Sequence, residues 1–140
     1  MSDPINEAIQ SFERWSKAFN SRDIDGMLNE MHFPHYRLSG YNDIKVWHSS
    51  SEHRNTLDLD TQILREEDWH ETTTSRLNAV QSGDNKVHLT FYQTRRNSDD
   101  VAYNSFETLW IFTRINAKWG ARFRSSFLNN SQADANFINN

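Results

Sequence analysis

The feature that most constrains the fold is a run of four strand-like segments in the second half of the chain. β-Branched and aromatic residues recur through 72–80, 86–94, 101–113 and 119–127. Turn-forming stretches such as S-G-D-N and R-N-S-D-D separate these segments. Because short turns join neighbouring strands in antiparallel order, this half of the chain is predicted to form an antiparallel meander.

One of these strands is apolar on both of its faces. Leu109 and Ile111 share one parity, whereas Phe106, Trp110 and Phe112 share the other. A strand that is apolar on both sides is covered on both sides. Helices can cover one face, and a second copy of the chain is the economical cover for the other. The pattern therefore predicts a homodimer that packs sheet to sheet.

The first half of the chain carries helical patterns. Asp3 and Pro4 suit the N-cap and first position of a helix over about 4–20. Its apolar residues recur at spacings of three and four: Ile5, Ala8, Ile9, Phe12, Trp15 and Phe19. Asp23 suits the cap of a second helix with the apolar stripe Ile24, Met27, Leu28 and Met31, which Phe33-Pro34 ends.

A small hairpin and a third helix are expected between these helices and the meander. Residues 36–38 and 44–47 flank the turn-rich S-G-Y-N-D segment, which is typical of a hairpin. S-S-S-E at 49–52 resembles a capping box, so a helix is predicted to begin there and to run towards Leu64.

Composition excludes several classes of function. The 140 residues suit one domain over 1–128, followed by a polar tail at 129–140. The net charge of −4, without a basic stripe, argues against nucleic-acid or membrane partners. The chain has no cysteine and no signal-like N-terminus, so a cytoplasmic protein without disulfides is expected.

No metal or organic cofactor is expected either. Without cysteine, a metal would need histidine and carboxylate ligands. His32 and His35 lie on either side of a proline break, with His32 expected at the C-terminal end of the second helix. His70 and Glu71 are adjacent in a predicted strand, so their side chains face opposite sides.

Two local motifs resemble the nuclear transport factor 2-like superfamily. They are E-R-W-S-K-A-F-N-S-R-D-I-D-G-M-L-N-E-M and K-W-G-A-R-F-R-S-S-F, and the resemblance covers roughly residues 5–127. It implies an α+β fold in which three N-terminal helices pack in the concave face of a strongly curved, mixed, mostly antiparallel sheet, the cystatin-like cone. Relatives in this superfamily include ketosteroid isomerase, scytalone dehydratase and polyketide cyclases, so the fold alone does not name an activity.

The resemblance also implies what the chain lacks. Laid over ketosteroid isomerase, Trp15 replaces the oxyanion-hole tyrosine, Ser39 replaces the general-base aspartate, and Trp110 lies near the position of the protonated aspartate. Steroid-type proton transfer by those groups is therefore not expected. The scytalone dehydratase pattern consists of paired histidines with an aspartate and tyrosines, and candidates for it remain in His35, His48, His70, Tyr36 and Tyr103.

His35 is the candidate catalytic residue. If Ser39 points into the cone, the two-residue strand period sends Arg37 and His35 the same way. An imidazole there would serve as a general base, since its ordinary pKa suits proton transfer near pH 7. The alternative is a structural histidine that hydrogen-bonds a backbone carbonyl and packs against Trp15 or Phe33.

Eight further residues are candidate ligand-binding groups. Arg122 and Arg124 share one parity in the last strand, so they face either the cavity, as an anion clamp, or the dimer surface. His48 precedes the third helix and is either exposed or at the mouth of the cone. The full set is Trp15, Arg37, Trp47, His48, Tyr103, Trp110, Arg122 and Arg124.

These residues favour an aromatic-lined pocket that binds a small, mainly apolar organic molecule through a few polar anchors. A cofactor-independent isomerase, dehydratase or cyclase that uses the same pocket is the catalytic alternative. A third hypothesis is a non-catalytic adaptor that binds another protein through its sheet.

Overall fold

The computed structural model describes residues 3–128, so the predicted tail at 129–140 lies outside the described residues. Within 3–128, three helices and six strands follow one another along the chain. In order they are α1 (Pro4–Ser21), α2 (Ile24–Asn29), β1 (Met31–Leu38), β2 (Ile44–Trp47), α3 (Ser50–Glu66), β3 (Trp69–Ser82), β4 (Lys86–Asn97), β5 (Ala102–Ile115) and β6 (Lys118–Ser126).

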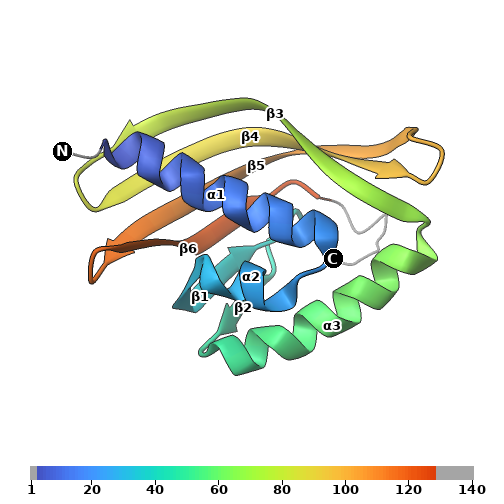
Figure 1. The fold of residues 1–140 in the computed structure, drawn as a ribbon, viewed down its shortest axis with the longest axis horizontal. Helices are drawn as coiled ribbons and strands as arrows, with labels where there is room; N and C mark the ends of the chain where they lie inside the picture. Colours follow the sequence, from blue (N-terminus) through green and yellow to red (C-terminus); the bar gives the residue numbers. More distant parts are fainter. Residues whose placement is uncertain (1–2, 129–140) are drawn as a thin grey trace.

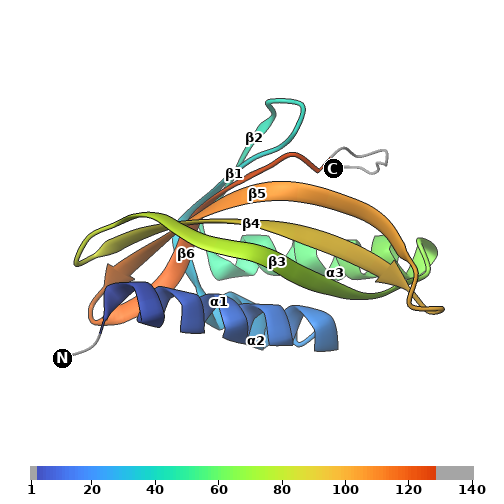
Figure 2. The same ribbon diagram turned by 90° about the horizontal axis from the view of Figure 1, so that it is seen from above.

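The six strands form one mixed sheet in the order β2-β1-β6-β5-β4-β3. Only β1 and β6 run parallel, and every other neighbouring pair is antiparallel. Irregularities interrupt the β3–β4 register at three places, and such bulges bend and twist a sheet. Figures 1 and 2 show the bent sheet with the helices on its concave side. The predicted α+β cone is confirmed.

The helices α1 and α3 begin where their capping residues predict. The Asp3 side chain accepts a hydrogen bond of 3.0 Å from the Ile5 N–H, and Pro4 occupies the first turn. Ser49 caps α3 by accepting from the Glu52 N–H, while the Glu52 carboxylate accepts from the His48 N–H.

The second helix is shorter than predicted. It ends at Asn29, and Met31–Leu38 is a strand, so the expected helix end at Phe33-Pro34 is wrong. Met31 is buried in the strand, and it also fits the apolar stripe of a helix. The spacing of apolar residues therefore did not distinguish a strand from a helix at this position. Pro34 is tolerated in β1 because the pairing with β6 is irregular between Met31 and Tyr36.

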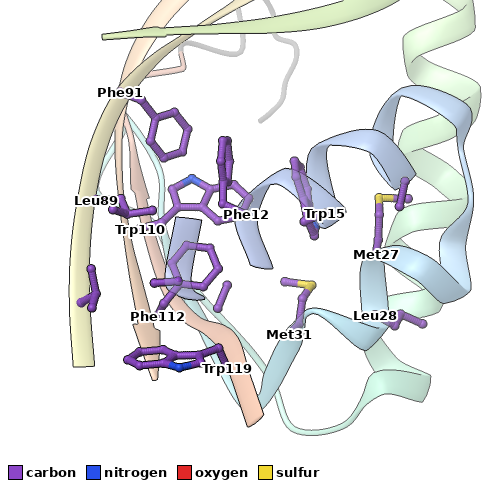
Figure 3. Packing of buried hydrophobic residues seen from close by; sticks show 14 of the residues in the cluster. Phe12, Trp15, Met27, Leu28, Met31, Leu89, Phe91, Trp110, Phe112 and Trp119 are labelled. Carbon is purple, nitrogen blue, oxygen red and sulfur yellow. The ribbon is translucent and has the colours of Figure 1, made fainter. Parts of the chain in front are cut away.

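Aromatic side chains form the centre of the core. Figure 3 shows Phe12 and Trp15 of α1 packed against residues of the central strands. The ring centroids of Phe12 and Phe91 lie 4.4 Å apart, and those of Trp15 and Trp110 lie 4.6 Å apart in an edge-to-face arrangement. These contacts hold α1 across the concave face of the sheet, and α3 lies beside it.

A buried carboxylate joins α1 to the start of β1. Glu30 is 4% exposed and accepts hydrogen bonds from the Ser11 hydroxyl at 2.8 Å and from two nitrogens of Arg14 at 3.0 Å each. Its carbonyl oxygen accepts from the Ala121 N–H at 2.8 Å. A buried charge needs such partners, so these bonds fix the α2–β1 connection against α1 and β6.

Two serines of α1 allow a matched test. Ser11→Ala should lower the free energy of unfolding by about 1 to 2 kcal/mol, because a buried carboxylate loses a hydrogen bond. Ser16→Ala should be near neutral, since the buried Ser16 hydroxyl makes no hydrogen bond within residues 3–128. Urea unfolding measures both, and equal losses for the two variants would contradict the account.

Candidate active site

A cavity of about 100 Å³ lies between α1, α3 and the concave face of the sheet. Trp15 and Phe19 reach it from α1, and His53, Leu57 and Asp60 reach it from α3. The sheet and the segment after it contribute Arg37, Trp47, Thr72, Gln93, Arg95, Phe106, Thr108, Trp110, Arg124, Ser126 and Leu128. The cavity therefore combines an aromatic lining with charged groups from both walls.

Strand register brings two arginines together on the concave face. Arg37 of β1 is the register partner of Arg124 of β6, which pairs in turn with Trp110 of β5. Trp110 is 2% exposed and belongs to the core, so this row of side chains faces the helices. The guanidinium carbon of Arg124 lies 5.3 Å from the Trp110 ring centroid and 5.9 Å from that of Trp47.

A β-bulge separates the two arginines of the last strand. Ile111 pairs with Phe123 and Phe112 pairs with Ala121, so Arg122 is an extra residue in β6. The bulge breaks the alternation, and the expectation that Arg122 and Arg124 share one face does not hold. Arg124 lines the cavity, whereas Arg122 does not.

His35 holds Arg124 in place. The Arg124 Nε donates a hydrogen bond of 2.8 Å to His35 Nε2, and His35 Nδ1 lies 2.9 Å from the Ala121 carbonyl oxygen. Arginine is only a donor, so His35 Nε2 must be the acceptor and Nδ1 must carry the proton. Burial, followed by the charge of Arg124, holds the His35 pKa well below its ordinary value. The imidazole is therefore neutral.

This geometry favours the structural role that the sequence left open for His35. A general base needs a free lone pair that faces the reacting molecule. Both ring nitrogens of His35 are already bonded, the side chain is 0% exposed, and its ring centroid lies 6.4 Å from that of Phe33. His35 lies behind the cavity wall, and Arg124 is the group that reaches the cavity.

Two charged groups of the cavity, Arg37 and Asp60, lack close partners. Among residues 3–128, Arg37 and Asp60 make no side-chain hydrogen bond and no ion pair within 4.0 Å, and both border the cavity. Burial lowers the pKa of the Arg37 guanidinium and raises that of the Asp60 carboxyl. Burial also lowers the Arg124 pKa to about 9, with the charge of Arg37 adding to the effect, so Arg124 stays charged at neutral pH.

His53 is a cavity residue that sequence reasoning missed. It is 2% exposed, its ring centroid lies 4.5 Å from that of Trp47, and its Nδ1 has no hydrogen-bond partner within residues 3–128. Burial, together with the charges of Arg124 and Arg37, lowers the His53 pKa to about 2. The helical period could have identified His53 as inward-facing. Spacings of four, three and four place it on one face of the helix with Leu57, Asp60 and Leu64.

The other sequence-predicted residues divide into two groups. Trp15, Trp47 and Trp110 line the cavity together with Arg37 and Arg124. His48 is exposed, and the Tyr103 hydroxyl donates to the Glu67 carboxylate at 2.7 Å, so neither lines the cavity. His32 is part of β1 instead of a helix end, and its Nδ1 lies 2.8 Å from the Thr113 hydroxyl.

Residues 3–128 contain no group of three histidine or carboxylate side chains that is placed to hold a metal ion. None of the helices in the same range is long and apolar enough to cross a membrane.

Comparisons with known proteins identify the fold. No protein-family model and no curated protein sequence matches the chain. A solved structure of a protein of unknown function with a cystatin-like fold from Nostoc punctiforme superposes with a TM-score of 0.67 at 15% identity, covering 86% of each chain. Aln2 from a Streptomyces species gives 0.70 at 10% identity, with 90% of this chain and 92% of that chain covered.

A third neighbour is a ketosteroid isomerase-like protein from Erwinia carotovora, with a TM-score of 0.65, 11% identity, and 90% and 96% of the two chains covered. Such identities establish the architecture alone. The chain has the cystatin-like cone fold of the nuclear transport factor 2-like proteins, as its motifs predict.

The buried histidine on α3 predicts a pH-dependent stability. The unfolded chain binds a proton at His53 below pH 6.5, but the folded chain does not until about pH 2. The free energy of unfolding therefore decreases as the pH is lowered through this window. His53 alone contributes a decrease of about 2 kcal/mol between pH 7 and pH 5. In His53→Leu that part of the loss should disappear.

Urea unfolding at the two pH values measures the effect. Asp60 shifts stability in the opposite direction and His35 in the same direction, but both are present in either protein and cancel in the comparison. An unchanged slope in His53→Leu would contradict the burial of a neutral imidazole.

Proposed function

We propose that this protein binds a small organic anion in the cavity between α3 and the concave face of the sheet. Arg37 and Arg124 hold the anionic group, and Trp15, Trp47 and Trp110 contact the apolar part of the ligand. The proposal keeps the small-molecule pocket expected from the sequence and adds a charge to its ligand.

The observation that carries the proposal is the state of Arg124. Its Nε is fixed by His35, and its two terminal nitrogens make no hydrogen bond within residues 3–128. A guanidinium that is held at Nε presents both terminal nitrogens in a fixed orientation, which matches the two oxygens of a carboxylate. Arg37, the register neighbour, adds a second unpaired charge beside it.

The charge balance of the cavity supports an anion over a neutral ligand. Among the lining residues that the structure describes, Arg37 and Arg124 face one carboxylate, that of Asp60, while Arg95 is paired with Glu67 at 3.2 Å. Two guanidinium groups in a partly dehydrated site repel each other, and an anion between them removes that repulsion. A neutral ligand would leave the repulsion in place.

The size and lining of the cavity limit the rest of the ligand. An engineered apolar cavity of about 150 Å³ holds benzene, so a partly open cavity of about 100 Å³ suits a ligand of at most one ring. The tryptophan faces suit a short apolar or planar body. Short-chain and single-ring carboxylates are therefore the ligand class to test.

The catalytic alternative loses the base that the sequence predicted. An isomerase, dehydratase or cyclase in this pocket needs a proton-transfer group that touches the substrate. His35 has no free lone pair. Binding is therefore the function proposed.

Neighbouring arginines of β6 allow a matched test of the anion site. Arg124→Gln should weaken the binding of butanoate or benzoate at least tenfold in isothermal titration calorimetry, because the bidentate contact is lost. Arg122→Gln removes the same charge two residues away and outside the cavity, so it should keep wild-type affinity. If both variants lost affinity equally, the loss would come from the change in net charge instead of from a contact in the cavity, and the pocket proposal would fail.

The homodimer stays a prediction with a defined surface. Leu109 and Ile111 lie on the convex face, opposite to the buried Trp110, and Ile111 pairs there with Phe123. Sedimentation velocity should show a dimer, and Ile111→Glu should convert it to a monomer. Leu59→Glu, on the exposed face of α3, should stay dimeric. A wild-type chain that is monomeric at all concentrations would leave this face to the adaptor hypothesis.

A further inference from the structure

We propose that the ligand of the cavity is a hydroxy acid, in which Asp60 accepts a hydrogen bond from the hydroxyl group while Arg37 and Arg124 hold the carboxylate. This assignment rests on the proposed function, because it names a second group on the same bound anion. It comes from Asp60, the one acidic side chain among the described residues that line the cavity.

Asp60 and the two arginines line the cavity from different elements without forming an ion pair. Asp60 belongs to α3, whereas Arg37 and Arg124 belong to the sheet, and all three side chains line the same cavity. The charges interact, but no nitrogen of either arginine lies within 4.0 Å of an Asp60 oxygen within residues 3–128. A carboxylate that does not close onto nearby guanidinium groups leaves room for a ligand group between them.

Two further polar groups that line the cavity are also without protein partners. Gln93 is 8% exposed, lines the cavity and makes no side-chain hydrogen bond within residues 3–128. His53 Nδ1 is buried without a partner on the same helix as Asp60. An unpaired carboxylate at Asp60 and an unpaired amide at Gln93 on one cavity leave positions for polar ligand atoms beyond the carboxylate that the arginines hold.

The surrounding charge decides which donor Asp60 meets. Arg37, Arg124, Arg22 and Arg95 all act on the Asp60 carboxyl. An ammonium group on the ligand would enter the field of these guanidinium groups and be repelled, with only one carboxylate to attract it. A hydroxyl group donates a hydrogen bond without adding positive charge. The neutral donor is therefore favoured, which separates hydroxy acids from amino acids.

The test compares matched ligands by isothermal titration calorimetry. The panel is butanoate, its 2-, 3- and 4-hydroxy derivatives, 3-aminobutanoate, benzoate and 3-hydroxybenzoate. At least one hydroxy acid should bind about tenfold or more tightly than its parent acid, because a hydrogen bond to a charged acceptor strengthens binding by that order. The amino acid should bind more weakly than the parent acid.

Variants of α3 connect this preference to Asp60. In Asp60→Leu the ratio between hydroxy and parent acids should fall to near one, whereas Asp58→Leu, an exposed carboxylate two residues away, should keep the wild-type ratio. Asp60→Asn, which keeps the shape of the side chain, should lower the ratio in part, and it replaces Asp60→Leu if that variant does not fold.

The outcomes separate the two proposals. Parent acids that bind through Arg124, with hydroxy acids no tighter or with 3-aminobutanoate tightest, would overturn the hydroxy-acid assignment and keep the anion site. A hydroxyl preference that survives in Asp60→Leu would also overturn it. No binding of any acid to the wild-type protein would overturn the proposed function itself.

Discussion

The hydrogen bond between Arg124 and His35 is the interaction on which the rest of the site depends. A guanidinium cannot give up its proton at physiological pH, so its burial against aromatic side chains needs a fixed acceptor. His35 can accept only while neutral, and the Ala121 carbonyl selects the required tautomer by binding Nδ1. One backbone carbonyl, one imidazole and one guanidinium thus form a chain from β6 through β1 to the cavity.

The cavity exists because α3 places polar residues where a packed core would need apolar ones. α1 fills its side of the concave face with Phe12 and Trp15, whose rings contact those of the strands. α3 turns His53 and Asp60 inwards, and neither side chain makes a hydrogen bond or an ion pair within residues 3–128. Unpaired polar groups in a partly dehydrated cavity lower the stability of the fold. Such a loss of stability is typical of a functional site.

The fold was predictable because its signals are local. Asp3 with Pro4, Ser49 with Glu52, and the alternation of the long strands each specify an element through short-range chemistry. Met31 was misassigned because its burial satisfies a helical and a strand pattern equally. The site was less predictable, since the bulge at Arg122 depends on pairing between β5 and β6, and periodicity within one strand does not contain that information.

The role of His35 illustrates the same limit. Its inward direction followed from the two-residue period of β1, but its chemistry depends on Arg124, which lies 89 positions away in the chain. An unperturbed imidazole suits proton transfer, whereas one between a carbonyl and a guanidinium has no free nitrogen. The same contact that removes His35 as a base orients Arg124 as an anion-binding group. The nearest partner, more than the residue type, therefore determines what a buried histidine does in this cone.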